Sequence, residues 1–220
     1  MSTQEPPKLG LRERGKLEKR RRIKQAARAV FLEKGYDAAT TREIAQAADV
    51  AIGTLFVYAK DKRDLLMMIV NDDLDAMNAE LAEARWEGPL IDQLTAFFAR
   101  RYAYWASEPR IARPAVQETF DFLSLSSGQG PETARFYARR STISELLTGL
   151  IAAKQRAGCI GSDHAAEDIA SLFMTIYLTE VRRWLNQDDP QVDQGMARLR
   201  KLMALALRGV QPADGEAGAV

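Results

Sequence analysis

Apolar residues recur at spacings of three and four along most of the chain, and no stretch keeps a two-residue alternation. Spacings of three and four place side chains on one face of an α-helix, whereas alternation would indicate strands. Ile23, Ala27 and Val30 form one such stripe within a first predicted helix, residues 16–34, which Gly35 ends. The pattern predicts an all-α protein of about nine helices.

Two short helices separated by a tight turn follow the first one. Thr40 and Glu43 have the spacing of a capping box, so the threonine side chain caps a helix over residues 41–48. Asp49 tolerates the left-handed backbone that a tight turn needs, and residues 52–58 form the next helix. A helix, a tight turn and a second helix are typical of a helix-turn-helix unit.

Longer helices are predicted in the rest of the chain, and proline or glycine separates most of them. Their approximate ranges are 62–85, 90–107, a sixth helix that contains Ile111 and Phe120 and ends before residue 126, 131–157, 163–185 with Asp163 as its cap, and 192–207. Residues 1–15 and 209–220 lack this periodicity, and we interpret them as a flexible arm and a flexible tail.

Charge is distributed unevenly, although the chain as a whole has 31 cationic and 30 anionic residues. Residues 1–62 contain 14 Lys and Arg against 8 Asp and Glu, a net charge of +6, and the remainder contains 17 against 22, a net charge of −5. Because phosphate neutralisation supplies most sequence-independent affinity for nucleic acid, this division suits a DNA-binding head on an acidic body. A solvated basic surface is the alternative interpretation.

The scarcity of cysteine and histidine excludes several classes of site. Cys159 and His164 are single residues of their type, which leaves no disulfide framework, Cys/His zinc cluster or ordinary Ser-His-Asp triad. We therefore expect no metal and no cofactor. Cys159 is expected to be a small buried residue, and His164 a partly exposed one at a helix start.

Membrane insertion and secretion are also disfavoured by the sequence. No apolar run approaches the roughly 20 residues that cross a bilayer, and residues 1–10 are polar and contain proline, unlike a signal peptide. We expect a soluble, cytoplasmic protein without a membrane partner.

Residues 40–66, TTREIAQAADVAIGTLFVYAKDKRDLL, resemble the signature of the TetR family of transcription regulators. With Phe31 and the pair Gly35 and Tyr36 before it, the resemblance covers about residues 20–66. It implies a regulator, most often a repressor, that leaves a palindromic operator in double-stranded DNA when a small-molecule effector binds. The domains expected from it are a flexible arm, 1–15; a three-helix helix-turn-helix DNA-binding domain, 16–62; a larger helical ligand-binding and dimerisation domain, 63–208; and a flexible tail, 209–220.

The candidate DNA contacts combine physical reasoning with this resemblance. Short residues at the start of a recognition helix let backbone and bases approach. By resemblance, Arg42 reaches a base edge, and arginine suits bidentate contact with guanine. The remaining phosphate and groove candidates give the full set: Arg20, Arg21, Arg22, Thr41, Arg42, Ala51, Ile52, Gly53, Thr54, Phe56, Tyr58 and Lys62. A solvated charge run is the alternative for the three consecutive arginines.

The sequence departs from the family pattern at three positions in this segment. Phe56 stands where a tyrosine is usual, Ala59 where a large aromatic residue is usual, and Ala51 where a capping serine is usual. Each change removes a contact without altering the predicted fold, so the operator sequence does not follow from the resemblance.

The resemblance also implies an effector cavity surrounded by the fifth to eighth helices. Aromatic residues are its candidate lining: Phe98, Tyr102, Trp105, Phe120, Phe136, Tyr137, Phe173 and Tyr177. Simple core packing is the favoured interpretation for any one of them. Arg101, Arg139 and Glu180 would anchor a ligand if they pointed inward, but a solvated face is the expected position for each.

Apolar stripes on the last two helices are candidates for a homodimer interface. They comprise Leu172, Val181, Trp184 and Leu185 on one helix and Met196, Leu199, Met203 and Leu207 on the other. Family members pair these helices across a two-fold axis, which sets two DNA-binding heads about one DNA turn apart. Two other classes stay open at this point: an enzyme on a helical scaffold, which lacks a recognisable catalytic motif, and a basic helix that binds a membrane surface or a partner protein.

Overall fold

The structure, a computed structural model, describes residues 10–118 and 129–209, and these ranges form nine helices and no strand. The helices are α1 (Leu11–Lys34), α2 (Thr41–Ala47), α3 (Ile52–Tyr58), α4 (Lys62–Glu83), α5 (Leu90–Ser107), α6 (Pro109–Glu118), α7 (Pro131–Arg156), α8 (Ala166–Leu185) and α9 (Val192–Gly209). The all-α prediction is confirmed.

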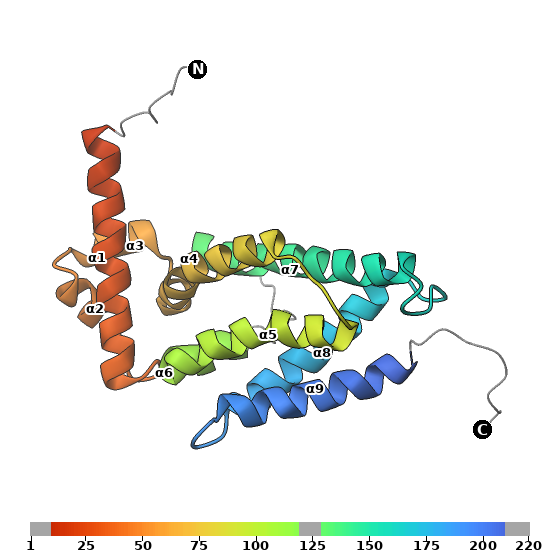
Figure 1. The fold of residues 1–220 in the computed structure, drawn as a ribbon. Coiled ribbons are helices and arrows are strands. Elements are labelled where there is room, and N and C mark those ends of the chain that lie inside the picture. The colour runs from red at the N-terminus through yellow and green to blue at the C-terminus, as the bar shows by residue number, and fades with distance from the viewer. Residues whose placement is uncertain (1–9, 119–128, 210–220) are drawn as a thin grey trace.

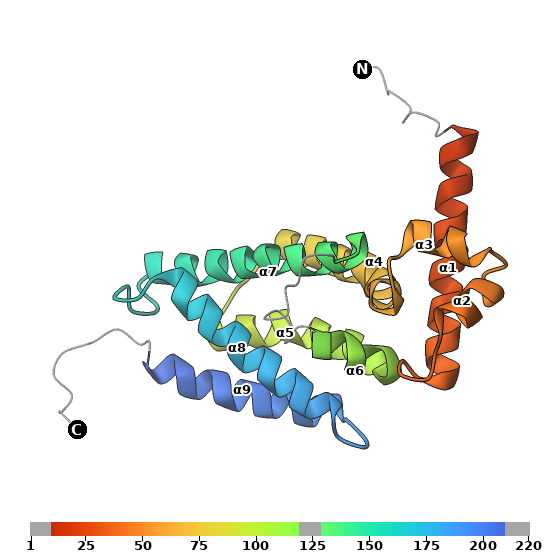
Figure 2. The same ribbon diagram turned by 180° about the vertical axis from the view of Figure 1, so that it is seen from behind.

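The helices form a small amino-terminal head and a larger body (Figure 1). The head consists of α1, α2 and α3 at one end of the molecule, with α1 running crosswise to the helices of the body. Seen from behind, α4 and α7 lie together on one side of the body, α9 lies on the opposite side, and α8 crosses between α7 and α9 (Figure 2). The carboxyl end of α9 is far from the head in both views.

Helix α1 begins earlier than the sequence pattern predicts. It starts at Leu11 rather than at residue 16, with Gly10 extended at its amino-terminal cap and Glu13 in its first turn. A glycine inside a helix costs only about 1 kcal/mol relative to alanine, so Gly15 does not interrupt it. The side chains of residues 11–19 are all exposed, and this segment projects beyond the rest of the head (Figure 1).

The turn between α2 and α3 has the predicted geometry. The Glu43 amide donates to Thr40 Oγ1 at 3.3 Å, and the Thr40 amide donates to Glu43 Oε2 at 3.0 Å, which completes the capping box. Asp49 has the left-handed φ of 52°. Leu55 is fully buried and α3 packs on α2, so the remaining sides of α3 are left for other contacts.

Helix α4 connects the head to the body. Its residues from Leu65 to Val70 are all fully buried, because α1 packs on one side of the helix and α7 and α6 pack on others. The buried apolar residues of head and body form one continuous cluster. The predicted division at residues 62 and 63 therefore falls at the start of a helix that both parts share.

The structure corrects details of the later helices. Helix α4 ends at Glu83, where the backbone turns extended at Ala84, and α8 begins at Ala166 without a side-chain cap, so Asp163 does not cap it. Cys159 is exposed, not buried, because it follows the turn at Gly158, whose φ is 67°. The prediction that the sixth helix extends through Phe120 falls outside the described residues.

The described ranges contain neither a membrane-spanning helix nor a metal-binding cluster. No helix there is long and apolar enough to cross a membrane. No cluster of three or more histidine, cysteine, aspartate or glutamate side chains there is arranged to hold a metal ion.

Candidate nucleic-acid interface and buried cavity

The exposed face of α3 is unusually apolar for a solvent-facing helix. Ile52, Phe56 and Val57 are 42%, 47% and 77% exposed, and Gly53 beside them adds no side chain. Large apolar side chains grouped on a surface mark a contact site for another molecule. Val57 was not among the sequence candidates, because helical periodicity alone does not show how far the exposed face of a two-turn helix extends.

Arg42 lies in the first turn of α2 and is exposed. Within the described ranges its guanidinium has no ion-pair or hydrogen-bond partner, so all its donors are available to an external acceptor. Thr41, Thr54 and Tyr58 are half-buried, and Ala51 is exposed at the cap of α3.

Lys62 is engaged inside the protein. Its Nζ donates to the carbonyl oxygen of Asp37 at 3.0 Å and lies 4.7 Å above the Tyr36 ring. Burial raises the pKa of Tyr36 to about 12, so this ring stays neutral. At the start of α4, Asp61 accepts a 2.8 Å hydrogen bond from the Asp64 amide. A carboxylate therefore already occupies the helix end that the sequence suggested for a DNA phosphate.

The three consecutive arginines of α1 have different surroundings. Arg20 is only 26% exposed and pairs with Asp72 at 3.1 Å and with Glu132 at 2.6 Å. Arg21 pairs with Glu18 on the helix surface, and Arg22 lies 3.7 Å from Asp49. The side chain of Arg20 thus joins α1 to α4 and α7 and is directed away from the head surface.

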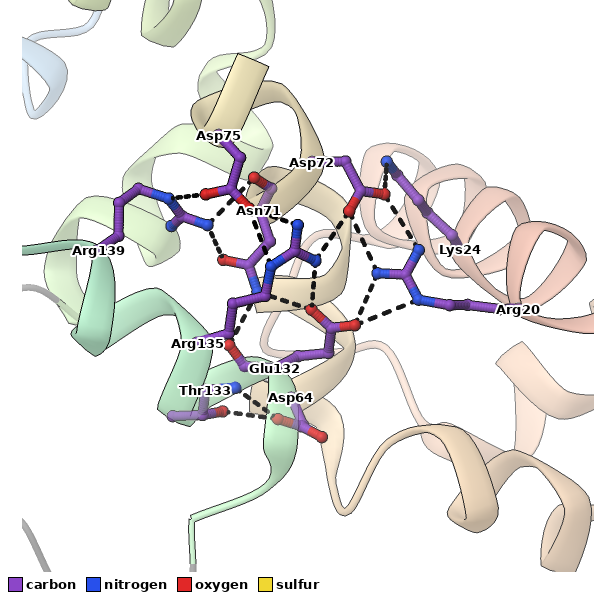
Figure 3. A network of polar contacts seen from close by, with 10 residues as sticks. All are labelled: Arg20, Lys24, Asp64, Asn71, Asp72, Asp75, Glu132, Thr133, Arg135 and Arg139. Atoms are coloured by element: carbon purple, nitrogen blue, oxygen red, sulfur yellow. Dashed lines mark hydrogen bonds and ion pairs between the residues drawn. The ribbon is translucent and has the colours of Figure 1, made fainter. Parts of the chain in front are cut away.

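Arg20 belongs to a polar network between the head and the body (Figure 3). Asp72 accepts hydrogen bonds from Arg20, from Lys24 at 2.9 Å and from Arg135 at 2.9 Å. Burial opposes ionisation of Asp72, but these three cations outweigh it and hold its pKa well below the ordinary value. Two helices of the body thereby hold α1 through charged side chains.

The network continues along α4 and α7 toward the interior. Asn71 donates to Glu132 Oε2 at 2.7 Å, and Arg139 Nη2 donates to Asn71 Oδ1 at 2.8 Å (Figure 3). Arg139 Nε also lies 2.5 Å from Asp75 Oδ1. The chain of contacts runs from Arg20 and Lys24 on α1 to Arg139, a side chain that lines the cavity in the body.

Asp64 joins the end of the head to the start of α7. It is fully buried, and one oxygen accepts from the Thr133 amide at 2.7 Å and from the Thr133 hydroxyl at 3.0 Å. Its other oxygen accepts from the Lys60 amide at 3.1 Å. The Asp64 carboxylate also fills the place that a Cβ on Gly130 would need, so glycine permits this close approach.

A cavity of about 50 Å³ lies inside the body, among α4, α5, α6, α7 and α8. Its walls are Leu74, Arg101, Trp105, Val116, Phe136, Arg139, Arg140, Ile143, Met174, Tyr177, Leu178 and Val181. Three predicted aromatic residues, Trp105, Phe136 and Tyr177, are among them. The Trp105 indole donates to the Tyr177 hydroxyl at 3.0 Å.

The other predicted aromatic residues occupy other positions. Phe98 stacks on Tyr177 with ring centroids 4.4 Å apart, and Tyr102 packs on Trp184 at 4.8 Å, while Phe173 is fully buried in the core. The half-buried Tyr137 donates to the Glu118 carbonyl oxygen at 2.9 Å. Phe120 lies outside the described residues.

Two arginines that were expected on a solvated face are buried at the cavity. Arg101 is 3% exposed and Arg139 is 5% exposed. Glu180 is buried as well, but Arg198 pairs with it at 2.7 Å. The expectation failed because Arg101 lies on the buried face of α5 together with the apolar residues. Periodicity alone did not show that a charged residue on this face is buried as well.

The expected dimer stripes are largely core of a single subunit. Val181, Trp184, Leu185, Leu199 and Met203 are all buried where α8 and α9 pack on each other and on α5. Two apolar side chains face outward instead, Leu172 of α8 at 44% exposure and Leu205 of α9 at 50%. Leu205 was absent from the predicted set.

An all-α chain whose head presents a helix-turn-helix with an exposed second helix has the architecture of a DNA-binding transcription regulator. Residues 23–67 match the family model described as bacterial regulatory proteins, tetR family. The amino-terminal part of the chain is therefore similar to this family.

Curated relatives agree with this assignment. An HTH-type transcriptional repressor of Mycobacterium tuberculosis is 26% identical over 79% of this chain and 86% of its own length. The HTH-type transcriptional repressor KstR of Mycolicibacterium smegmatis is 24% identical over 87% of this chain and 86% of its own length.

Solved structures share the fold. Thermus thermophilus FadR, a TetR-family transcriptional repressor in complex with lauroyl-CoA, has a TM-score of 0.65 and 21% identity, covering 91% of this chain and 100% of its own. Bacillus subtilis FadR in complex with stearoyl-CoA has a TM-score of 0.62 and 18% identity, covering 87% and 99%. At these identities the likeness concerns the fold alone.

Proposed function

We propose that this chain is a cytoplasmic repressor whose homodimer binds a palindromic operator and leaves it when a small-molecule effector binds. The observation that carries the proposal is the exposed apolar face of α3 next to an unpaired Arg42. The repressor function of the curated relatives supports it. The proposal assigns no catalytic activity to the chain.

In this proposal α2 and α3 read the bases. Arg42 contacts a guanine edge with its free guanidinium. Ile52, Phe56 and Val57 meet the C5 methyl groups of thymines, because apolar contact is the means by which such side chains distinguish that base. Gly53 lets the α3 backbone come close to the groove.

Phosphate contacts come from the edges of the head. Thr41, Thr54 and Tyr58 carry hydroxyl groups next to the exposed face, and Lys62 reaches a phosphate only by leaving the Asp37 carbonyl. The projecting start of α1 adds sequence-independent affinity, and its exposed cations take the role first expected of Arg20. These cations are Arg12, Arg14, Lys16 and Lys19.

The homodimer forms in this proposal through the outward faces of α8 and α9. Leu172 and Leu205 provide exposed apolar anchors on the two helices. An interface related by a two-fold axis places two heads about one DNA turn apart, roughly 34–36 Å, which requires a palindromic site.

The effector occupies the buried cavity in this proposal. Stearoyl-CoA and lauroyl-CoA are bound by the two FadR neighbours, and the mainly apolar walls here suit a lipophilic molecule too. Since α7 contributes Arg139 to the cavity and Glu132 to the contact with Arg20, displacement of α7 would alter how α1 is held. Release from DNA then follows from a difference in effector affinity between the two head positions.

Selection of bound sequences from a random duplex library, at a stated salt concentration, tests the proposal. We expect the purified protein to enrich a palindrome whose half-sites contain guanine and thymine. Replacement of the enriched thymines by deoxyuridine removes the methyl groups and should weaken binding. A folded dimer that enriches no sequence would contradict the proposal.

A further inference from the structure

The cavity wall includes a buried arginine, Arg101, that no carboxylate in the described ranges neutralises. Three arginines line it, and no aspartate or glutamate is among the described residues of its wall. Arg139 is neutralised through Asp75, which it contacts with Nε. Arg101 forms no ion pair with any carboxylate in the described ranges; its Nη2 donates to the neutral Asn78 side chain.

Both buried arginines also retain unused donors. Arg101 Nε and Arg139 Nη1 are buried and have no hydrogen-bond partner among the residues that the structure describes. Burial lowers the pKa of Arg101; the neighbouring Tyr177 opposes this shift, and the nearby Arg139 adds to it. A buried charge without a counter-charge is costly, and such groups are normally paired.

The two arginines with unused donors come from different helices and line the same cavity. Arg101 extends from α5 and Arg139 from α7, and the cavity lies between them. The two oxygens of a carboxylate or phosphate can accept short, charge-assisted hydrogen bonds from the N–H groups of two guanidinium side chains. The rest of the wall is mainly apolar, with Leu74, Ile143, Met174, Leu178 and Val181 around the aromatic residues.

We infer that this cavity binds an amphipathic anion, with the acidic head between Arg101 and Arg139 and the apolar part against the aliphatic wall. The inference rests on the proposed effector role of the cavity and adds the charge of the effector. A volume of about 50 Å³ admits a head group but not a tail, because drug-sized ligands fill about 300–1,000 Å³. Binding therefore requires wall side chains such as Met174 to move.

Direct binding measurements test this inference. The probes are hexanoate, decanoate and dodecanoate, their matched alcohols, and decyl phosphate, titrated into the full-length protein while tryptophan fluorescence is followed. Trp105 in the cavity wall should report occupancy. We expect at least one acid to bind about tenfold more tightly than its matched alcohol, because only the acid carries a charged group that accepts charge-assisted hydrogen bonds from arginine. A preference for decyl phosphate over the acids would identify the head group as a phosphate.

Neighbouring arginines on α5 provide the matched variants. Arg101→Met should abolish the preference for the anion and leave binding of the alcohol unchanged or stronger. Arg100→Met removes an arginine that is 49% exposed and pairs with Glu80, and it should retain the preference. Equal binding of acids and alcohols to the wild type, or an unchanged preference in a folded Arg101→Met variant, would overturn the inference.

Operator binding is measured separately with the selected duplex. Wild-type protein that binds this duplex but no anionic probe would overturn the anion site and leave the DNA-binding proposal standing. Anion binding that depends on Arg101 but does not release DNA would support the site and contradict the effector role.

Discussion

Arginine side chains that look equivalent in the sequence have different roles once their partners are known. Arg42 is exposed and unpaired within the described ranges, whereas Arg20 is held by Asp72 and Glu132. A sequence shows the charge of a side chain but not which carboxylates a fold brings beside it from residues far along the chain. The DNA-contact candidates on α2 and α3 therefore remain proposals that the exposed surface supports, and Arg20 is the weakest candidate.

Replacement of Arg42 by alanine should relax base preference more than it weakens general DNA binding. Loss of a bidentate contact with a base typically costs about 1–3 kcal/mol of discrimination. We expect affinity for the selected operator to fall about tenfold, with little change on unrelated duplexes, measured by fluorescence anisotropy at fixed salt.

Arg100→Ala, on α5 in the body, is the control for the Arg42 experiment. It should leave both affinities unchanged. An equal loss on specific and unrelated duplexes in the Arg42→Ala protein would assign Arg42 to the phosphate backbone.

Glu43 links the stability of α2 to pH. Hydrogen bonds from Lys34 at 2.6 Å and from the Thr40 side chain and backbone lower its pKa to about 2 from 4.5. A carboxylate whose pKa is lower in the folded state contributes stability above about pH 4.5, and loses that contribution as the pH falls toward about 2. As the pH falls over this range, the melting temperature measured by thermal unfolding should decrease less for Glu43→Gln than for the wild type.

Glu87→Gln, at an exposed position after α4, is the matched change for the pH experiment. It should reproduce the wild-type profile. Identical pH profiles for Glu43→Gln and the wild type would show that the capping box carries no linked proton.

At the scale of helices, the sequence predicted what local chemistry determines. The capping box at Thr40 and the left-handed Asp49 both depend on residues close together in the chain, and both are confirmed. The early start of α1 was missed because residues 1–15 lack apolar periodicity and were therefore assigned to a flexible arm. Burial of Arg101 and Arg139 was missed because it depends on how α4, α5 and α7 come together.

Two glycines next to or inside α7 offer a test of how tightly that helix joins α4. Gly130→Ala should destabilise the protein, because the new Cβ would meet the Asp64 carboxylate that caps the helix. Gly149→Ala, in the same helix with nothing within 4 Å of its Cβ position, should stabilise it by about 0.5–1 kcal/mol. Relative to the wild type, the urea midpoint should fall for Gly130→Ala and rise for Gly149→Ala. Equal shifts in the two variants would show that the Asp64 side chain can move to make room for the new Cβ.

At the scale of the whole molecule, two apolar side chains of α8 and α9 face outward, and the sequence predicted only one of them, Leu172. Apolar stripes on α8 and α9 serve two purposes that periodicity does not separate, the subunit core and a surface for a second subunit. Val181 and Leu199 belong to the core, while Leu172 and Leu205 face outward. The fold class was therefore predictable from the pattern, whereas the interface requires knowledge of which side is already covered.

A double change, Leu172→Glu with Leu205→Glu, should convert the proposed dimer into a monomer. Charged groups on an apolar interface lose hydration without gaining partners, and like charges would face each other across the two-fold axis. Light scattering after size-exclusion chromatography measures the mass directly. Leu11→Glu, at the 81% exposed start of α1, is a control that should remain dimeric. A double variant that remains dimeric would show that the interface does not include these two residues.

Asp64 finally limits how this protein is recombined with its relatives. Its carboxylate accepts from the Lys60 amide on one side and from Thr133 on the other, so the last residues of the head are bonded to a helix that begins far later in the chain. A chimera cut at residue 62 would transplant half of this joint. Asp64, Gly130 and Thr133 all stay with the body in such a chimera, so a foreign head must supply a backbone amide in the place of Lys60.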